Sequence, residues 1–342
     1  MRADVGIAAG RGELGLLRQI RARVAGNPSG ELRLGIGDDC ALIRPRPGEE
    51  LAVTTDLSIA GRHFRLDWHP PEAVGHRALA RGLSDLAAMG ARPVAAFLSL
   101  GVPAELPRRQ GRGRSWVDRF FDGLLALAAA HRTPLAGGDL AESPLVVADI
   151  VLVGAVTRGR ALLRSGALPC ELLYVTGALG GAAAGLARLQ KLSKGRDLTG
   201  PIPVRHQPAL APHLYPQPRI AQGLRLQRSG LATAALDLSD GLSTDLAHLC
   251  EESGVAAEVD AANLPIHAGA TLKQALHGGE DYELLFTAAA NTRIPRQILG
   301  VPITRIGRIL RRRSGQPAVM LVTAQGRMPL DRQGWEHFRA GD

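Results

Sequence analysis

Short apolar segments that each end in an aspartate recur along this chain of 342 residues, with glycine or serine beside most of the aspartates. Such borders are where a strand or helix gives way to a loop, so the pattern predicts acidic side chains presented at the ends of elements. Seven aspartates share this setting: Asp38, Asp39, Asp56, Asp85, Asp139, Asp237 and Asp240. Converging carboxylates repel one another unless cations lie between them, and hard oxygen ligands suit Mg²⁺ or Mn²⁺. The pattern therefore predicts a Mg²⁺-dependent enzyme that acts on phosphates.

Each aspartate taken alone also has a purely structural explanation, because Asp beside Gly or Ser is common in turns and at helix N-caps. Asp139 follows two glycines, as a turn residue does, and Ser239 with Asp240 fits a cap for the segment that follows. The adjacency of Asp38 and Asp39 favours the metal site, since a cap needs one oxygen and not two neighbouring charges.

Composition limits the classes of protein to which the chain can belong. Apolar residues make up 45% and charged residues 21%, as in ordinary globular proteins, and the length favours two domains. No apolar run reaches the roughly 18 residues that a membrane span needs, and the N-terminus lacks the pattern of a signal peptide. Three cysteines without paired spacing fit a reducing compartment. We therefore expect a cytoplasmic protein without a membrane partner.

The net charge of +9 comes almost entirely from arginine, because the chain has only three lysines. Such a charge helps to draw in anionic substrates. The arginine runs at 108–114 and 311–313 have no interleaved aromatic residues and no recognisable nucleic-acid module, so nucleic acid is not the expected partner. A non-catalytic nucleotide- or RNA-binding protein is a distant alternative.

The order of the predicted elements favours an α/β or α+β fold, because strand patterns alternate with helical patterns. The strand segments are 51–55, 94–100, 146–157 and 172–176. The helical segments are 11–25, 71–89, 116–131, the alanine-rich stretch up to 192, and 219–229. The pattern pauses around 159–169, which predicts domains at 1–158 and 159–342. Residues 193–218 are rich in proline and are expected to form an extended connection.

Five motifs that follow one another in this chain resemble those of the thiamine-monophosphate kinase family, within the aminoimidazole ribonucleotide synthetase-like superfamily. They are Gly35-Ile36-Gly37-Asp38-Asp39, Leu83-Ser84-Asp85-Leu86-Ala87-Ala88-Met89-Gly90, Gly137-Gly138-Asp139, Leu238-Ser239-Asp240-Gly241-Leu242 and Gly278-Gly279-Glu280-Asp281-Tyr282-Glu283-Leu284. Singly, these motifs are shared with relatives such as aminoimidazole ribonucleotide synthetase, which stays the nearest alternative. Gly334-Trp335-Glu336-His337-Phe338 near the C-terminus points to the kinase.

The resemblance implies a two-domain architecture, with an N-terminal sheet that pairs with a second subunit in a homodimer and a C-terminal α/β domain. It also implies transfer of the ATP γ-phosphoryl group to thiamine monophosphate with several Mg²⁺ ions. The implied metal ligands are Asp39, Thr54, Thr55, Asp56, Asp85, Asp139, Asp237 and Asp240. The implied ATP contacts are Phe121, Gly138, Asp139, Arg164 and Ser239. The implied contacts with thiamine monophosphate are His63, Glu280 and Trp335, and the residues assigned to catalysis are Asp39, Asp240 and Arg164.

The chemistry of the residues agrees with this assignment. A phosphate monoester has a second pKa near 6, so at neutral pH it attacks largely as a dianion without a general base. The enzyme must then supply positioning and cations, which explains why acidic metal ligands outnumber candidate proton carriers. The Walker A pattern is absent, which argues against an ordinary P-loop kinase.

Three of the assigned side chains have clear roles in such a reaction and also plain structural alternatives. Arg164 is the candidate for stabilising charge on the transferring group, or else a surface arginine. Trp335 suits the cationic thiazolium ring, with a cation–π attraction of about 0.5 to 2 kcal/mol, or else packs a C-terminal element. Glu280 is able to bond the aminopyrimidine, or else is a carboxylate at a strand edge. A loop role for His63 is likewise commoner than substrate contact.

Overall fold

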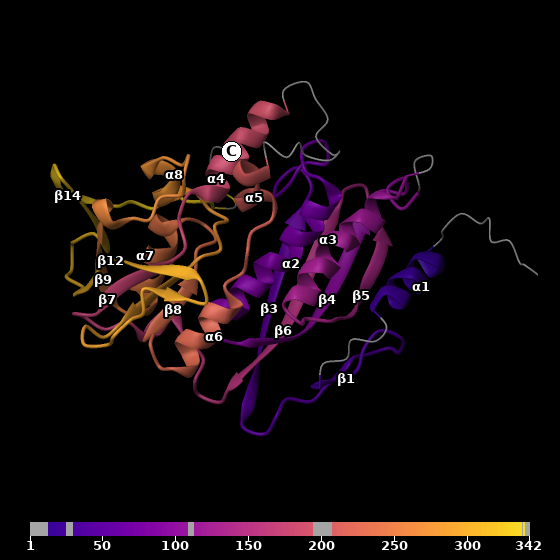
Figure 1. The fold of residues 1–342 in the computed structure, drawn as a ribbon, viewed down its shortest axis with the longest axis horizontal. Coiled ribbons are helices and arrows are strands. Elements are labelled where there is room, and N and C mark those ends of the chain that lie inside the picture. The colour runs from indigo at the N-terminus through magenta and orange to yellow at the C-terminus, as the bar shows by residue number, and fades with distance from the viewer. Residues whose placement is uncertain (1–12, 25–29, 109–112, 194–206, 337, 339–342) are drawn as a thin grey trace, which may run out of the picture.

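The computed structural model describes residues 13–24, 30–108, 113–193, 207–336 and 338. These residues form two large sheets and one small sheet of two strands, and helices pack on both large sheets, so the predicted α/β class with two sheet-forming halves is confirmed (Figure 1). In the described part of the chain, no helix is long and apolar enough to cross a membrane.

The N-terminal half contains a sheet of four strands in the order β3-β6-β4-β5. The strands are β3 (Glu49–Ile59), β6 (Val147–Thr157), β4 (Arg92–Val102) and β5 (Leu135–Glu142). β4 and β5 run parallel, whereas the other neighbouring pairs are antiparallel. Helices α2 (Pro71–Ala88) and α3 (Trp116–Ala130) lie side by side on one face of this sheet (Figure 1). Helix α1 (Glu13–Val24) and the short strands β1 (Leu32–Leu34) and β2 (Leu42–Ile43) precede them.

Helix α2 is the central element of the molecule. It begins at Pro71, whose missing N–H is harmless in a first turn, and fifteen of its 18 residues are buried. It crosses α3 and α6 (Ile220–Arg228) at glycines, so that backbone meets backbone. A Cβ added at Gly75, Gly123 or Gly223 would lie 1.9, 1.8 or 1.9 Å from the carbonyl oxygens of Phe120, Glu72 and Ala87, respectively.

The C-terminal half contains a second, larger sheet in the order β14-β13-β9-β12-β7-β10-β8, with β11 paired to β12. Its strands are β7 (Leu172–Thr176), β8 (Ala234–Asp237), β9 (Val255–Asp260), β10 (Leu284–Ala288), β11 (Gln297–Ile298), β12 (Val301–Arg311), β13 (Val319–Thr323) and β14 (Gly326–Pro329). β13 and β9 are parallel, and the other pairs are antiparallel. The accompanying helices are α4 (Gly181–Leu192), α5 (Gln207–Leu214), α7 (Leu242–Glu252) and α8 (Leu272–His277).

The proline-rich segment 193–218 was expected to be extended, and this expectation is wrong for its second part. Residues 207–214 form α5, with Pro212 inside the helix, while 194–206 lie outside the described residues. Burial explains the helix, because Leu210 and Leu214 pack with Leu189 of α4 and Ala73 of α2. Tertiary packing therefore overrides the local preference of proline for extended structure.

The face of the N-terminal sheet opposite α2 and α3 is covered in part by β1 and β2, where Leu32 and Ile43 pack with Val94 of β4, and it is open over β3. On β3 the side chains alternate, and Ala52 packs toward the helices, so Leu51, Val53 and Leu57 point to the open face. These three apolar residues are 43, 63 and 45% exposed. Such a group of exposed apolar residues on one strand marks a surface that another protein chain would cover.

Candidate active site

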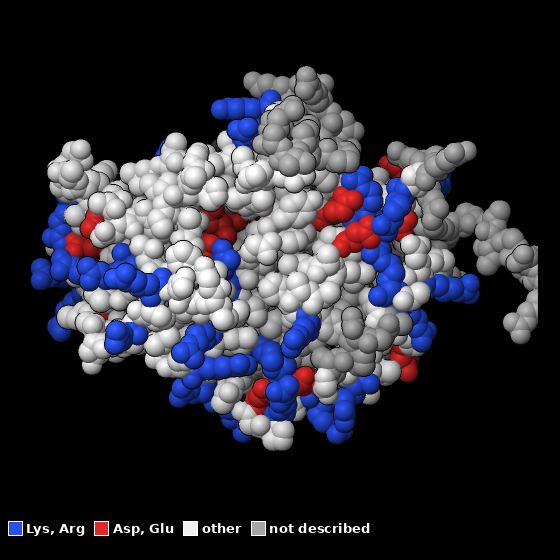
Figure 2. All heavy atoms as spheres, viewed as in Figure 1, with Lys and Arg blue, Asp and Glu red and all other residues white. Residues whose placement is uncertain are grey.

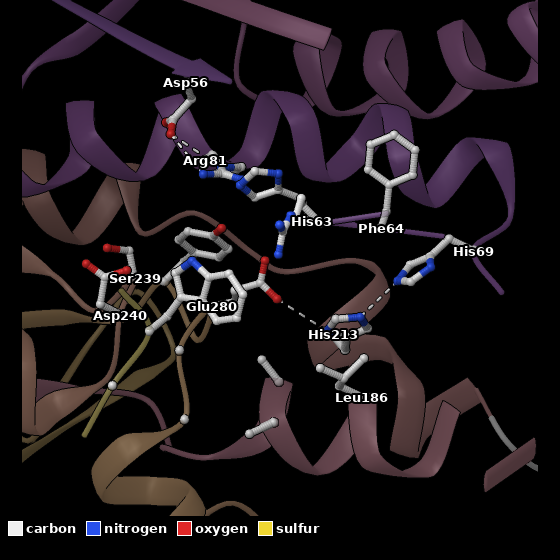
Figure 3. Close-up of a pocket in the computed structure, with 18 of the residues that line it drawn as sticks. Asp56, His63, Phe64, His69, Arg81, Leu186, His213, Ser239, Asp240 and Glu280 are labelled. Carbon is white, nitrogen blue, oxygen red and sulfur yellow. Dashed lines mark hydrogen bonds and ion pairs between the residues drawn. The ribbon is translucent and has the colours of Figure 1, made fainter. Parts of the chain in front are cut away.

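A cavity of about 790 Å³ lies between the loop 61–69, α2, α4 and the ends of the C-terminal elements. Eight of the residues predicted from the sequence line this one cavity, although they come from segments far apart in the chain (Figure 3). They are Asp56, His63, Asp85, Asp237, Ser239, Asp240, Glu280 and Trp335. The remaining predicted residues lie elsewhere and are described below.

The acidic end of the cavity combines carboxylates from both halves of the chain. Asp237 ends β8 and accepts a hydrogen bond of 2.7 Å from the Ser84 hydroxyl of α2. Asp85, one residue further along α2, accepts a hydrogen bond from the Thr54 hydroxyl of β3. Burial, together with the nearby Asp85 charge, raises the pKa of Asp237 to about 7. Carboxylates that are held this close favour a bound cation.

Asp56 is the third carboxylate of this end and is paired with Arg81 of α2, at 3.3 Å (Figure 3). Burial raises the pKa of Asp56 to about 6, although the guanidinium opposes the shift. The sequence reasoning missed Arg81. The signal was available, because Arg81 precedes Asp85 by four residues and therefore shares a face of α2 with it.

The donor set at the acidic end fits Mg²⁺ that is held jointly with phosphate groups. Among the described residues, no three His, Cys, Asp or Glu side chains are arranged to hold one ion by themselves. Mg²⁺ commonly takes one or two carboxylates and completes its shell with water and substrate phosphates. Asp56, Asp85 and Asp237 supply ligands of that kind.

Ser239 and Asp240 lie in the turn between β8 and α7. The structural alternative, in which they cap α7, does not apply: the N-cap is Gly241, and no side chain caps it. Instead the backbone N–H groups of Asp240 and Gly241 both donate to Asp245, each at 3.0 Å. The backbone N–H of Trp335 donates to the Asp240 carbonyl at 3.0 Å, which ties the C-terminal segment to this turn.

The other end of the cavity holds the residues predicted to bind thiamine monophosphate. The ring of His63 is oriented by the backbone N–H of Ile59, which donates to Nδ1 at 3.0 Å, so the neutral ring carries its proton on Nε2. Glu280 has a φ of 69°, in the left-handed region that non-glycine residues rarely adopt. Trp335 is 47% exposed at the rim. His63, Glu280 and Arg81 lie close together in Figure 3.

Thr54 and Arg164 line a second cavity of about 470 Å³, which shares Asp85 with the first one. Arg164 is exposed in the short 3-10 helix Arg164–Gly166, and its carbonyl accepts a hydrogen bond from Ser253. Asp85 therefore lies between the acidic end of the first cavity and the predicted cationic group for the transferring phosphate.

Five predicted residues lie outside both cavities. Asp39 is exposed in the loop after β1, and Gly138 and Asp139 are exposed on β5. Thr55 points to the open face of the sheet, because it alternates with Thr54. Asp139 also points there, since Leu140 next to it packs with the helix-covered core.

Phe121 is the fifth of these residues, and its predicted contact with ATP does not agree with its position. The ring is only 2% exposed and packs edge-on against Phe120 in the core between α2 and α3. An aromatic residue on an amphipathic helix is usually a core residue, and here the helical period decides the direction of the side chain.

The turn that carries Glu280 also ties the cavity to the rest of the C-terminal half. Asp281 accepts hydrogen bonds of 2.5 and 2.9 Å from the backbone N–H groups of Gly180 and Ala182, at the start of α4. Two residues on, Glu283 accepts from Arg219 at the start of α6. Sequence reasoning gave a role here only to Glu280, because the partners of Asp281 and Glu283 are far away in the chain.

Asp281 gives a prediction for the pH dependence of stability. Burial raises its pKa to about 7 in the folded protein, above its unfolded value, so the stability it contributes is fully present at low pH and is lost as the pH rises through about 7. As the pH rises from about 5 to about 7, we expect the unfolding free energy of Asp281→Asn to increase by about 2 kcal/mol relative to that of the wild type. Urea unfolding of both proteins at several pH values measures this. A constant difference across the range contradicts it.

The distribution of charge on the surface favours the approach of anionic substrates. Lys and Arg side chains gather along the lower and left margins of the face in Figure 2, and a smaller acidic group lies near its centre. A net charge of +9 raises the local concentration of phosphates around the molecule, while the acidic end of the cavity requires cations beside them.

Comparison with known proteins agrees with the fold and shows the family. The N-terminal domain model of AIR synthase related protein matches residues 37–159, and the C-terminal domain model of the same family matches residues 171–317. Thiamine-monophosphate kinase of Salmonella typhimurium is 38% identical, over 96% of this chain and 98% of that protein.

Two solved structures are also similar. The crystal structure of thiamine-monophosphate kinase from Stenotrophomonas maltophilia K279a has a TM-score of 0.77 and 39% identity, over 90% of this chain and 96% of that one. AaThiL complexed with AMPPCP and TMP has a TM-score of 0.72 and 29% identity, over 97% of this chain and 100% of that one. With curated relatives of this identity matched over nearly their whole length, the chain belongs to the thiamine-monophosphate kinase family.

Proposed function

We propose that this protein transfers the γ-phosphoryl group of ATP to thiamine monophosphate and so forms thiamine diphosphate. One observation carries the proposal: a single cavity has acidic residues at one end and His63, Glu280 and Trp335 at the other. The names of the relatives support the reaction, and the AaThiL complex supports an ATP analogue and TMP as the two ligands.

The geometry suits direct transfer between two phosphates. Trp335 offers an aromatic face to the thiazolium ring, and Glu280 a carboxylate to the aminopyrimidine. The acceptor phosphate then points to the acidic end, where it needs no base because it is already a dianion at neutral pH. Mg²⁺ bound there supplies the positive charge that lets two polyanions approach. Arg164, beyond Asp85, stabilises negative charge on the transferring group.

The test is the reaction itself, with purified protein, ATP and thiamine monophosphate, with and without Mg²⁺, and with free thiamine as the control acceptor. We expect Mg²⁺-dependent thiamine diphosphate from the monophosphate and no product from thiamine. Product that forms equally from thiamine contradicts the need for a phosphate nucleophile. Folded protein that binds ATP and forms no product contradicts the proposal and favours a sister synthetase.

We also propose the domain division 1–158 and 159–342, a homodimer and a cytoplasmic location. The N-terminal sheet ends with β6 at Thr157, and the C-terminal sheet begins with β7 at Leu172, which supports a division between them. The exposed thiols of Cys40 and Cys170 fit a reducing compartment. The exposed apolar residues of β3 support pairing of two open sheet faces.

The homodimer gives a separate prediction. Val53 is 63% exposed on the open face, so a charge placed there is desolvated if two such faces meet. We expect the wild type to have twice the chain mass in light scattering and Val53→Arg to be a folded monomer. The same substitution at Leu299, which is 76% exposed on the C-terminal half, is the control. A monomeric wild type, or a dimer that survives in Val53→Arg, contradicts this proposal.

A further inference from the structure

We propose that Arg77 is a positioning residue for the acceptor end of the cavity, where it holds His63 and Glu280 in a fixed relation across the two halves of the chain. The inference rests on the proposed function for the identity of the acceptor. Its structural basis is a buried polar group formed by Arg77, His69, His213 and Glu280.

One guanidinium joins three separate segments. Arg77 lies on α2, and its side chain is only 6% exposed. Nη2 donates to Glu280 Oε1 at 2.5 Å and to the carbonyl of His63 at 3.4 Å. Nη1 donates to the carbonyl of His213 on α5. The loop that carries His63, the turn that carries Glu280 and helix α5 therefore share one hydrogen-bonding centre.

Two buried histidines form the wall beside this centre. Nε2 of His69 lies 3.0 Å from Nε2 of His213, and Figure 3 shows the pair to the right of Glu280. One ring must donate and the other accept, so the two rings are not both protonated. Burial, reinforced by Arg77, lowers the pKa of His69 to about 3 and lowers the pKa of His213 well below its usual value. The two neutral rings therefore form part of the cavity wall and contribute no charge to it.

The Glu280 carboxylate is bound by Arg77 on one side and faces the cavity on the other. Oε1 bonds to Arg77, Oε2 lies 3.6 Å from Nδ1 of His213, and the side chain is 27% exposed to the cavity. Its backbone is in the left-handed region, a strained conformation that persists only where the surroundings over-determine it. Two interactions hold Glu280 in this conformation: the contact with Arg77 and the hydrogen bond of 2.8 Å that its backbone N–H donates to the Ser239 carbonyl.

Lysine cannot replace this guanidinium. Arginine presents several donors in a rigid plane, whereas a lysine ammonium is a point charge on a flexible stem. In Arg77→Lys the positive charge remains, and at most part of the contact with Glu280, the His63 carbonyl and α5 survives. The variant therefore separates positioning from charge balance.

The experiment measures steady-state kinetics with each substrate varied at saturation of the other, for wild type, Arg77→Lys, Glu280→Gln and the double variant. We expect Arg77→Lys to raise KM for thiamine monophosphate at least about tenfold, while KM for ATP and kcat change less than about threefold. The double variant should have a KM for thiamine monophosphate no higher than that of Glu280→Gln, because both substitutions disrupt the same contact between Arg77 and Glu280. Calorimetric binding of thiamine monophosphate without ATP should weaken by the same factor.

The matched control is Arg119→Lys. Arg119 of α3 makes a bidentate pair with Glu72 at 2.7 and 2.8 Å, outside the cavity, so the same chemical change there should leave both KM values within about twofold. An unchanged KM for thiamine monophosphate in Arg77→Lys overturns the inference. Equal rises in both KM values, or fully additive effects in the double variant, overturn it as well, because they indicate a general structural role.

A variant that does not fold and a wild type that forms no product each need a separate measurement. If Arg77→Lys does not fold, His213→Asn replaces it, because it keeps Arg77 and removes the ring that faces Oε2. That variant should raise KM for thiamine monophosphate about threefold or more and spare KM for ATP, and no change overturns the inference. Wild type that forms no thiamine diphosphate overturns the proposed function. Active wild type with an indifferent Arg77 overturns the positioning role alone.

Discussion

Asp240→Asn is expected to lower kcat for thiamine diphosphate formation by about 10³-fold or more while the protein stays folded. The side chain lines the acidic end of the cavity and does not cap α7, whose N-cap is Gly241. The substitution removes one negative charge and leaves in place the backbone bonds from Asp240 to Asp245 and from Trp335 to Asp240. The effect should therefore fall on catalysis, as a loss of ligand charge for the cations that hold two phosphates together.

The measurement is kcat at saturating substrates and Mg²⁺, with thermal unfolding as the test of fold. Asp260→Asn is the matched control: Asp260 accepts hydrogen bonds from Ala262 and Asn263 outside the cavity, and an asparagine oxygen is able to accept there too. Its kcat should be unchanged within about twofold. Full turnover by Asp240→Asn would remove the residue from its assigned role.

Gly75→Ala is expected to be among the most damaging changes of a single methyl group, with a loss of about 3 kcal/mol or more in unfolding free energy. The added Cβ would lie 1.9 Å from the carbonyl oxygen of Phe120, which belongs to the backbone of α3 and cannot rotate away. Since α2 is also in backbone contact with α6, the two helices cannot separate without loss of other packing. Alanine is the better helix former, so propensity alone predicts the opposite sign.

Urea unfolding of Gly75→Ala and of Gly30→Ala separates these two effects. Nothing lies within 4 Å of a Cβ added at Gly30, so the same chemical change there should alter stability by less than about 0.5 kcal/mol. Gly75→Ala with wild-type stability would show that α2 and α3 adjust their distance easily.

The sequence reasoning succeeded where a local pattern is enough to place a side chain. The helical pattern over 71–89 predicted α2, and the apolar-to-polar borders predicted that Asp56 and Asp237 end strands or lie near their ends. Convergence of such ends then brought eight predicted residues to one cavity. Functional residues at the ends of elements are predictable from the sequence, because each strand or helix fixes the position of its own end.

The reasoning failed where the partner of a residue is remote in the chain. Arg77 looks like an ordinary helical arginine, yet its partners His213 and Glu280 are 136 and 203 residues away. Strands β9, β12, β13 and β14 were not predicted. β12 shows the reason, because Arg305, Arg308 and Arg311 interrupt it and only pairing with β7 and β9 makes it a strand. Such arginines stay in a strand when carboxylates such as Glu258 neutralise them.

The glycine contacts of α2 also bear on how the cavity is able to change shape. Interlocked side chains permit small sliding adjustments, but two helix backbones in direct contact leave almost no tolerance for displacement. α2 is held in this way by α3 on one side and by α6 on the other. The wall that carries Asp85, Arg81 and Arg77 is therefore a fixed frame of reference. Any change in the width of the cavity must come from the opposite wall, which α4 forms.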